Sequence, residues 1–168
     1  MPRVFIGMGS NLAHPRRQLA RAARALQRVA RTRIVAISHN YLSAPMGAQA
    51  PQPDYVNAVA EVDTALAPRA LLRQLLLIEQ RQRRKRDAGG ARNLPRTLDL
   101  DLLIYGDRRL RTRELTLPHP RMHERAFVLR PLSELDAHLR IPGRGIARRW
   151  LAHAAMQPVA RTRTHVSY

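Results

Sequence analysis

Apolar residues recur along the chain with two different periods, which divide it into segments typical of strands and of helices. Alternating or continuous apolar runs predict β-strands over residues 3–8, 33–43, 55–64 and 97–105. Apolar residues at helical spacing predict helices over residues 14–30 and 67–82, and a third helix fits residues 120–132. A proline lies in the first turn of each of the first two helices, where its missing amide hydrogen costs nothing.

Turn residues mark most of the segments in between. Residues 44–53 hold three prolines and predict a loop, and the basic segment 83–95, which contains two adjacent glycines, predicts a mobile loop. Residues 108–117 predict a small hairpin or an irregular edge. The last stretch of the chain carries weak signals, so we expect its end to be loosely held.

The predicted order is strand, helix, strand, strand, helix, strand. This order is typical of an α+β fold of the ferredoxin-like kind, a βαββαβ core in which an antiparallel-rich sheet is covered by helices on one face. We expect one domain over residues 1–168, with residues 140–168 as a C-terminal extension of weak signal.

Composition narrows the class of protein. The chain has 168 residues, 45% of them hydrophobic and 25% charged, which favours a globular chain over a disordered one. Cysteine is absent, which excludes disulfides and thiolate metal sites. No apolar run approaches the ~18 residues of a membrane span, and the first apolar run is too short for a signal peptide. We therefore expect a cytoplasmic protein with no membrane partner.

The charge is strongly positive and unevenly placed. Lys and Arg number 30 against 12 Asp and Glu, for a net charge of +18, and no acid precedes Asp54 or follows Asp136. One interpretation is a solvated basic surface, of which the stripe Arg17, Arg21, Arg24, Arg28 and Arg31 would be an ordinary outer helix face. The other is a polyanionic partner, either a nucleic acid or the phosphates of a nucleotide.

Asp99 and Asp101 form the strongest local signal for chemistry. Residues two apart on a strand point to the same face, so the two carboxylates lie side by side while the neighbouring leucines point the other way. Adjacent like charges are costly unless a cation neutralises them, and a rigid pair of carboxylates suits Mg²⁺. Two acids on a solvated strand face, or acids paired with arginines, would give the same spacing.

The segment just before this strand is rich in arginine, with Arg84, Arg86, Arg92 and Arg96. Arginine binds phosphate oxygens through two-pronged, charge-assisted hydrogen bonds. Carboxylates that bind metal beside cations that bind phosphate are the components of phosphoryl transfer. The GxxxxGK[ST] loop is absent, which excludes a P-loop enzyme, and residues 7–11 (GMGSN) are only a weak indication of a nucleotide.

Five motifs together make the chain resemble the 6-hydroxymethyl-7,8-dihydropterin pyrophosphokinase family, from about Val4 to Leu135. They are IGMGSNL at 6–12, YLSAPMG at 41–47, PDYVNA at 53–58, PRTLDLDLL at 95–103, and LPHP at 117–120 followed by RAFVL at 125–129. Their order along the chain makes the resemblance far more specific than any one of them. It implies the ferredoxin-like α+β fold, in agreement with the predicted order of elements.

The resemblance also implies which residues act on ATP. Two Mg²⁺ ions that bridge the ATP phosphates would be held by Asp99 and Asp101. The residues that contact ATP would be Glu79, Arg84, Arg86, Arg96, His119 and Arg125. The catalytic set implied in this way consists of the two metal ligands and three arginines that stabilise the transferred group: Arg84, Arg86, Arg96, Asp99 and Asp101.

A second set would bind the pterin. The resemblance implies that the ring lies between Tyr55 and Phe127 and that Asn57 reads its hydrogen-bonding edge, with help from the loop residues Ser43, Ala44 and Met46. Stacking between two aromatic faces is favourable and excludes water. Taken without the resemblance, the two aromatic residues would instead be interpreted as packing residues.

The expected activity is transfer of pyrophosphate from ATP to the hydroxymethyl group of the dihydropterin, which yields AMP and a pterin diphosphate for folate biosynthesis. We expect a monomer whose partners are ATP and the pterin, and not nucleic acid. Asn93-Leu94 replaces the family's usual Trp-Gly pair, and Leu76 and Ala44 replace a glutamine and a proline. A divergent paralogue with a related pterin substrate or no activity, or a basic nucleic-acid-binding module of similar fold, are the alternatives.

Overall fold

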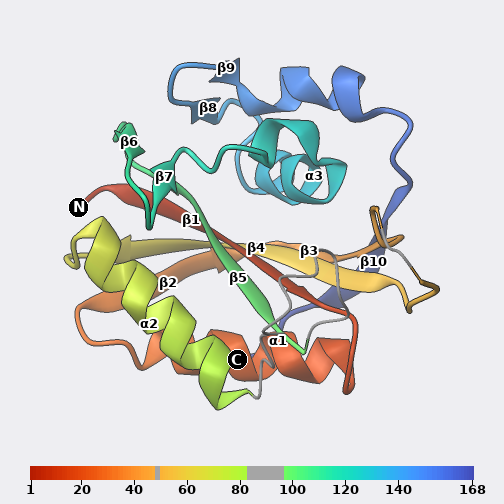
Figure 1. The fold of residues 1–168 in the computed structure, drawn as a ribbon, viewed down its shortest axis with the longest axis horizontal. Helices are drawn as coiled ribbons and strands as arrows, with labels where there is room; N and C mark the ends of the chain where they lie inside the picture. The colour runs from red at the N-terminus through yellow and green to blue at the C-terminus, as the bar shows by residue number, and fades with distance from the viewer. Residues whose placement is uncertain (48–49, 83–96) are drawn as a thin grey trace.

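The computed structural model describes residues 1–47, 50–82 and 97–168, and a six-stranded antiparallel sheet forms the middle layer of this part of the chain (Figure 1). The strands are β1 (Arg3–Ser10), β2 (Thr32–Ile37), β3 (His39–Ser43), β4 (Tyr55–Thr64), β5 (Asp99–Tyr105), β6 (Leu110–Arg111), β7 (Thr116–Leu117), β8 (Arg140–Ile141), β9 (Gly145–Ile146) and β10 (Val159–His165). The α-helices are α1 (Pro15–Gln27), α2 (Pro68–Arg81) and α3 (Ala126–Leu135), and the 3₁₀ helices are η1 (Met122–Glu124) and η2 (Ala147–Ala154). The predicted α+β class is confirmed, and the elements follow the predicted βαββαβ order except that the second predicted strand is divided into β2 and β3.

The main sheet has the strand order β10-β3-β4-β1-β5, with β2 also paired to β4. Ile6 of β1 lies opposite Ala60 of β4 on one side and opposite Leu102 of β5 on the other. The strand predicted at 97–105 has the continuous apolar run that is typical of a central strand, but β5 ends the order of the described strands. Its apolar run instead reflects two covered faces, since Leu102 packs into one core and Leu103 into the other.

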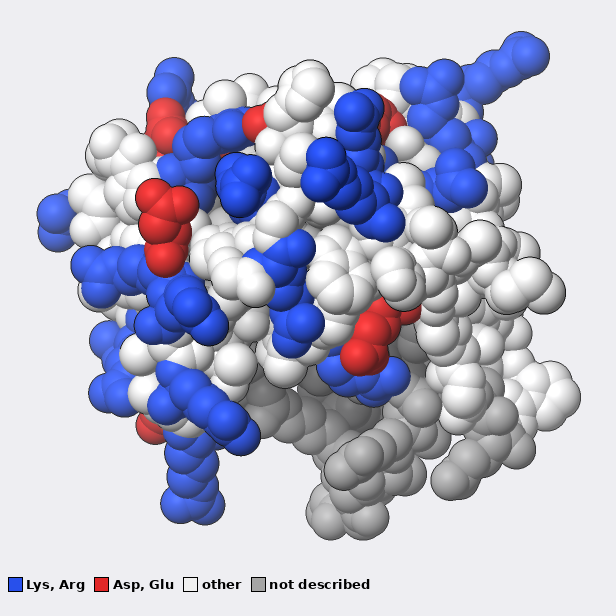
Figure 2. Space-filling model, turned by 90° about the horizontal axis from the view of Figure 1, so that it is seen from above, with Lys and Arg blue, Asp and Glu red and all other residues white. Residues whose placement is uncertain are grey.

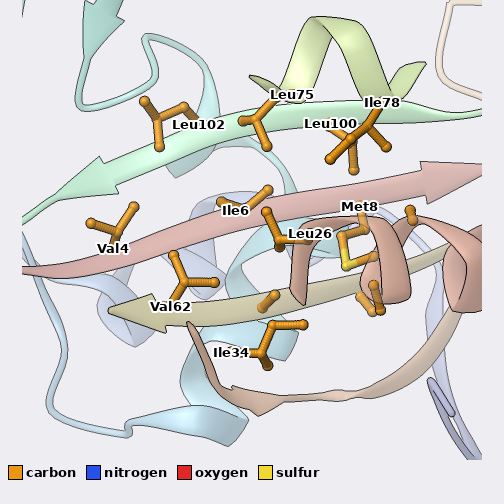
Figure 3. Close-up of a cluster of buried hydrophobic side chains, with 14 of the residues drawn as sticks. Val4, Ile6, Met8, Leu26, Ile34, Val62, Leu75, Ile78, Leu100 and Leu102 are labelled. Atoms are coloured by element: carbon orange, nitrogen blue, oxygen red, sulfur yellow. The ribbon is translucent and has the colours of Figure 1, made fainter. Parts of the chain in front are cut away.

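Helices cover both faces of the sheet, whereas the sequence predicted one face only. Figure 1 shows α1 and α2 below the sheet and α3 with η2 above it. Figure 3 shows the lower core, in which Ile6 and Met8 of β1 and Leu100 of β5 lie against Leu75 and other side chains from the two helices. The upper core is built around Phe5, Val59 and Leu103 with side chains of α3 and η2. Most of β4 is therefore buried on both faces.

Residues 33–43, predicted as one strand, form two strands that are separated by Ser38. This serine is fully buried, and it makes two hydrogen bonds to the backbone of Val59. Its amide donates to the Val59 carbonyl at 3.0 Å, and its hydroxyl accepts from the Val59 amide at 3.0 Å. The hydroxyl replaces a backbone carbonyl in the ladder, so β2 and β3 pair with different halves of β4.

The last third of the chain is more ordered than its sequence pattern predicts. Residues 120–132 contain η1 and only the first part of α3, because Arg125 between them has an extended backbone (φ −115°, ψ 109°). The end of the chain was expected to be loosely held, but β10 joins the main sheet, with Val159 opposite Ser43 of β3. Its largely exposed edge position explains why no apolar alternation marks it. The hairpin predicted at 108–117 is confirmed as β6 and β7.

Basic side chains are spread over the surface. Figure 2, which shows the face that carries α3 and η2, has Lys and Arg side chains dispersed among uncharged ones, with few acids. Every arginine of the predicted stripe on and after α1 is exposed, as the pattern indicated. Within the ranges described, no helix combines the length and the apolar character needed to cross a membrane.

The lower core yields a stability prediction on a single helix. Leu75 of α2 is completely buried, whereas Leu77 on the same helix is 41% exposed. Leu75→Ala should lower the free energy of unfolding by about 2–5 kcal/mol, because it removes buried contacts and leaves a cavity. Leu77→Ala, the matched control, should change it by less than about 0.5 kcal/mol. If urea denaturation showed equal losses of unfolding free energy for the two variants, the packing described would be contradicted.

Candidate active site

A cavity of about 380 Å³ opens between one end of the sheet and the segment that leads into α3. The glycines of β1, the loop after β3, the start of β4, and β5 supply the sheet side, and residues 121–128 supply the other. Among the predicted site residues, those that line it are Ser43, Ala44, Met46, Tyr55, Asn57, Asp99, Asp101, Arg125 and Phe127. Segments far apart in the sequence thus bring most of the described candidates to one place.

The two aspartates of β5 point into this cavity, as their spacing predicted. Both are partly buried, and the leucines on either side of Asp99, Leu98 and Leu100, are buried in the lower core. In the pairing with β1, Asp99 lies opposite Gly9 and Asp101 opposite Gly7. At the two positions opposite the carboxylates, β1 therefore has no side chain, which leaves room for a ligand.

Gly9 is required by a close approach and not by its backbone angles. A Cβ atom at this position would lie 3.0 Å from Oδ1 of Asn57. That asparagine is buried, and its Nδ2 donates to the Ser43 hydroxyl at 2.7 Å. The sequence indicated this glycine only as a weak nucleotide signal, but its role here is to leave space beside a fixed amide on the cavity floor.

Arg125 and His119 both lie close to Asp101. Nη1 of Arg125 lies 3.6 Å from Oδ2 of Asp101, and Nε2 of His119 lies 3.9 Å from Oδ1. Both distances exceed that of a good hydrogen bond, so the Arg125 guanidinium attracts the Asp101 carboxylate through its charge. The Arg125 guanidinium also lies over the Phe127 ring, 5.6 Å from its centre. The cavity thus combines acids, a cation and an aromatic surface.

His119 is neutral at physiological pH. Burial, reinforced by the positive charge of Arg125, lowers its pKa to about 4, although the negative charge of Asp99 opposes this shift. Its Nδ1 accepts a hydrogen bond from the Arg121 amide at 3.2 Å. The single ring proton is therefore on Nε2, the nitrogen nearer Asp101, so the contact with Asp101 is not an ion pair. His119 adjoins the cavity through that carboxylate without lining it.

Glu79 lies outside the cavity lining. It is 1% exposed on the inner face of α2, and its carboxylate accepts the amide hydrogen of Leu100 at 2.8 Å. Leu100 is the residue between the two aspartates, so this bond fixes the strand that carries them. The expected contact of Glu79 with ATP stays a prediction, and this structural role was not foreseen.

Four arginines implicated by the sequence, Arg84, Arg86, Arg92 and Arg96, lie outside the described residues, as does the loop predicted at 83–95. Sequence reasoning missed Arg121, whose side chain lines the cavity beside the predicted residues. Its place between the LPHP and RAFVL segments was the only available signal.

The donor set fits Mg²⁺. Two carboxylates, two residues apart on one strand, face the cavity. Over the described ranges, no group of three or more His, Asp or Glu side chains could enclose a metal by itself. Magnesium is usually bound in this way, by one or two carboxylates together with water and phosphate oxygens. Asp99 and Asp101 are therefore the residues that could hold it.

Solved structures with the same fold include two HPPK-DHPS chains. One, in complex with substrates, has a TM-score of 0.67 at 12% identity and covers 89% of this chain. The other, from Plasmodium falciparum, has a TM-score of 0.66 at 11% identity over the same share. This chain spans 43% and 45% of their lengths. At such low identity the likeness concerns the fold alone.

Sequence comparison identifies the family. The family model for 7,8-dihydro-6-hydroxymethylpterin-pyrophosphokinase (HPPK) matches residues 5–137. Relatives named 2-amino-4-hydroxy-6-hydroxymethyldihydropteridine pyrophosphokinase include one from Pseudomonas aeruginosa, 49% identical over 83% of this chain and 84% of its own. Others come from Haemophilus influenzae, 44% identical over the same shares, and Bacillus subtilis, 36% identical over 79% and 77%. With these matches over most of its length, and with a cavity that holds the expected acids, cation and aromatic residues, the chain belongs to the HPPK family.

Proposed function

We propose that this protein transfers the β,γ-diphosphoryl group of ATP to the hydroxymethyl oxygen of 6-hydroxymethyl-7,8-dihydropterin, in folate biosynthesis. The observation that carries the proposal is the pair Asp99 and Asp101, which faces a cavity also lined by Tyr55, Asn57 and Phe127. The names of the relatives at 36–49% identity agree with it. A monomeric state and a cytoplasmic location are parts of the same proposal.

The proposed reaction forms one bond and breaks one. The pterin hydroxyl oxygen attacks the β-phosphorus of ATP, the bond from that phosphorus to the α,β-bridging oxygen breaks, and AMP leaves while the hydroxyl proton is lost to solvent. The protein contributes alignment and charge neutralisation, and no covalent intermediate. Two Mg²⁺ ions, when bound, would neutralise phosphate charge.

Each side of the cavity has a part in this reaction. Asp99 and Asp101 would hold the metal ions, and Arg125 would contact the phosphates from the opposite side. His119, neutral and with its proton on Nε2, can donate a hydrogen bond to a phosphate oxygen without adding charge. Arg84, Arg86 and Arg96 are proposed to complete the phosphate clamp, on the strength of the sequence motif alone.

The pterin would occupy the side of the cavity lined by Tyr55 and Phe127. The buried pair Asn57 and Ser43 offers an amide and a hydroxyl whose positions are fixed by their mutual hydrogen bond. Such a preordered polar pair favours a flat heterocycle with a complementary edge over a flexible ligand. Ala44 and Met46, in the loop that follows Ser43, would close this edge.

Replacing one carboxylate tests the proposal directly. Asp101→Asn should lower AMP formation from ATP, Mg²⁺ and the dihydropterin by at least about 100-fold, because a charge needed to hold the metal is lost. Phosphorus NMR should show AMP and a pterin diphosphate with the wild-type protein and much less of both with Asp101→Asn. Asp107→Asn, in the exposed turn after β5, is the control and should retain full activity. Near-normal turnover in Asp101→Asn would refute the assignment, and wild-type pterin binding without AMP would identify a paralogue that has lost catalysis.

The aromatic wall gives a separate prediction. Phe127→Leu should raise the dissociation constant for the pterin about tenfold, because an aromatic stack is replaced by an aliphatic contact. The dissociation constant for a non-hydrolysable ATP analogue should change much less. Phe127→Tyr, which keeps the ring, should bind the pterin nearly as the wild type does. Calorimetric titration measures both ligands, and unchanged pterin affinity in Phe127→Leu would show that the ring is only a packing residue.

His119 should stay neutral far below the usual range of histidine. In the folded, ligand-free protein, the NMR signal of its ring Cε1 proton should remain constant from pH 8 to about 5 and move only around its pKa of about 4. In urea the same proton should titrate near 6.5. Because the native state then binds fewer protons than the unfolded state between these two values, this residue should reduce stability as the pH falls through that window. A native midpoint near 6.5 would contradict the buried, neutral ring.

A further inference from the structure

The side chain of Gln157 bonds to the backbone on both sides of Arg125. Its Oε1 accepts the amide hydrogen of Ala126 at 2.9 Å, and its Nε2 donates to the carbonyl of Glu124 at 2.7 Å. One side-chain amide thus spans the residue that faces Asp101. These two bonds join parts of the chain more than 30 residues apart.

This segment needs an external partner. Arg125 has an extended backbone between η1 and α3, and its own side chain does not cap the helix that follows. The first amide groups of a helix lack partners within the helix, and Ala126 is the first residue of α3. Gln157 supplies the acceptor for that amide from a distant part of the chain. An ordinary N-cap side chain belongs to the residue just before the helix and accepts from the second or third helical amide.

Gln157 is itself held from both directions. Before it, η2 ends at Ala154, a buried residue of the upper core whose carbonyl accepts the Gln157 amide at 3.1 Å. After it, β10 begins with Val159, which pairs with Ser43 at the cavity. The glutamine therefore connects the sheet side of the site to the start of α3.

The bonds act on residues that matter for the proposed reaction. Arg125 reaches Asp101 at 3.6 Å and lies over the ring of Phe127. Gln157 and Phe127 also share the wall of a smaller cavity of about 170 Å³ next to the main one. A shift of the backbone at 124–126 would therefore move the guanidinium and the aromatic wall together.

We propose that Gln157 is a positioning residue for the proposed diphosphoryl transfer, which acts by fixing the backbone of Arg125 so that its guanidinium and the Phe127 ring keep their places in the cavity. The inference rests on the proposed function. It concerns a residue beyond 5–137, the part of the chain that matches the family model. The C-terminal segment thereby contributes to the site without touching the substrates.

The test compares two glutamines that both bond to backbone. Gln157→Met removes both bonds at similar volume, whereas Gln27→Met removes the bond from the Ile34 amide to Oε1 of Gln27, which is 3.0 Å long and lies at the end of α1. In Gln157→Met, kcat/KM for the pterin should fall at least about tenfold at a temperature where the protein is folded, since small misplacements of catalytic groups are costly. Gln27→Met should retain wild-type kinetics even if it melts earlier.

Amide hydrogen exchange provides a readout that general destabilisation would not give. In Gln157→Met, exchange should accelerate at Ala126 and Phe127, because the acceptor that holds the start of α3 is lost. The amides of Ala22, Ala23 and Leu26, which are buried in the lower core on α1, should remain protected as in the wild type. Protection on α1 reports on global stability, and protection at Ala126 reports on the local bond.

Gln157→Glu serves as the conservative variant. It keeps the acceptor for the Ala126 amide and loses the donor to the Glu124 carbonyl, so its kcat/KM should lie between those of the wild type and Gln157→Met. Wild-type kinetics in Gln157→Met, or losses in kcat/KM equal to those of Gln27→Met, would overturn the inference. A wild-type protein that forms no AMP would instead refute the proposed function, and amide exchange at Ala126 would still show whether Gln157 fixes this backbone.

Discussion

The pairing of β5 with β1 is the constraint on which the site depends. It places Leu100 and Leu102 in the lower core and, by the two-residue period of a strand, turns Asp99 and Asp101 toward the cavity. A slip of one residue would turn both carboxylates into the lower core and remove both leucines from it, so the packing of the core selects the register. The same packing therefore holds the two acids side by side, although their mutual repulsion opposes that arrangement.

A second bond strengthens this constraint at the edge of the sheet. The amide of Leu100 points away from β1 and finds its acceptor in the buried carboxylate of Glu79 on α2. A buried carboxylate is costly unless it is well bonded, and an edge-strand amide without a partner is costly as well. The hydrogen bond between them gives each group a partner, at the residue between the two aspartates. The helix below the sheet thus contributes to the geometry of a site that lies above it.

The opposite wall of the cavity is organised by different means. The start of α3 carries Arg125 and Phe127, and its backbone is fixed by Gln157 from the C-terminal segment. His119 is kept neutral by burial and by neighbouring positive charge, so that it adds a hydrogen-bond donor beside Asp101 without a further cation. The acids come from the sheet, the cation from the residue just before α3 and the aromatic ring from α3. A ligand would bind where the two sides meet.

Local periodicity was sufficient to predict part of this arrangement. It located β4 at its observed bounds and placed Asp99 and Asp101 on one face, because the alternation of a strand depends only on residues that are adjacent in the sequence. It did not predict the break at Ser38, the pairing of β10 with β3 or the role of Glu79. Each of these depends on a partner about 20 or more residues away, and the pattern within one segment does not identify that partner. Motif resemblance located most of the cavity residues but gave no sign of Gln157.

The most direct measurement is a crystal structure of the protein with Mg²⁺, 6-hydroxymethylpterin and an ATP analogue whose α,β-bridging oxygen is replaced by a methylene group. Magnesium should be bound to carboxylate oxygens of both Asp99 and Asp101 at about 2.0–2.1 Å. The pterin ring should lie between Tyr55 and Phe127, with its hydroxymethyl oxygen directed at the β-phosphorus. A nucleotide bound without metal contact to either aspartate, or a pterin bound outside this cavity, would contradict the proposed site.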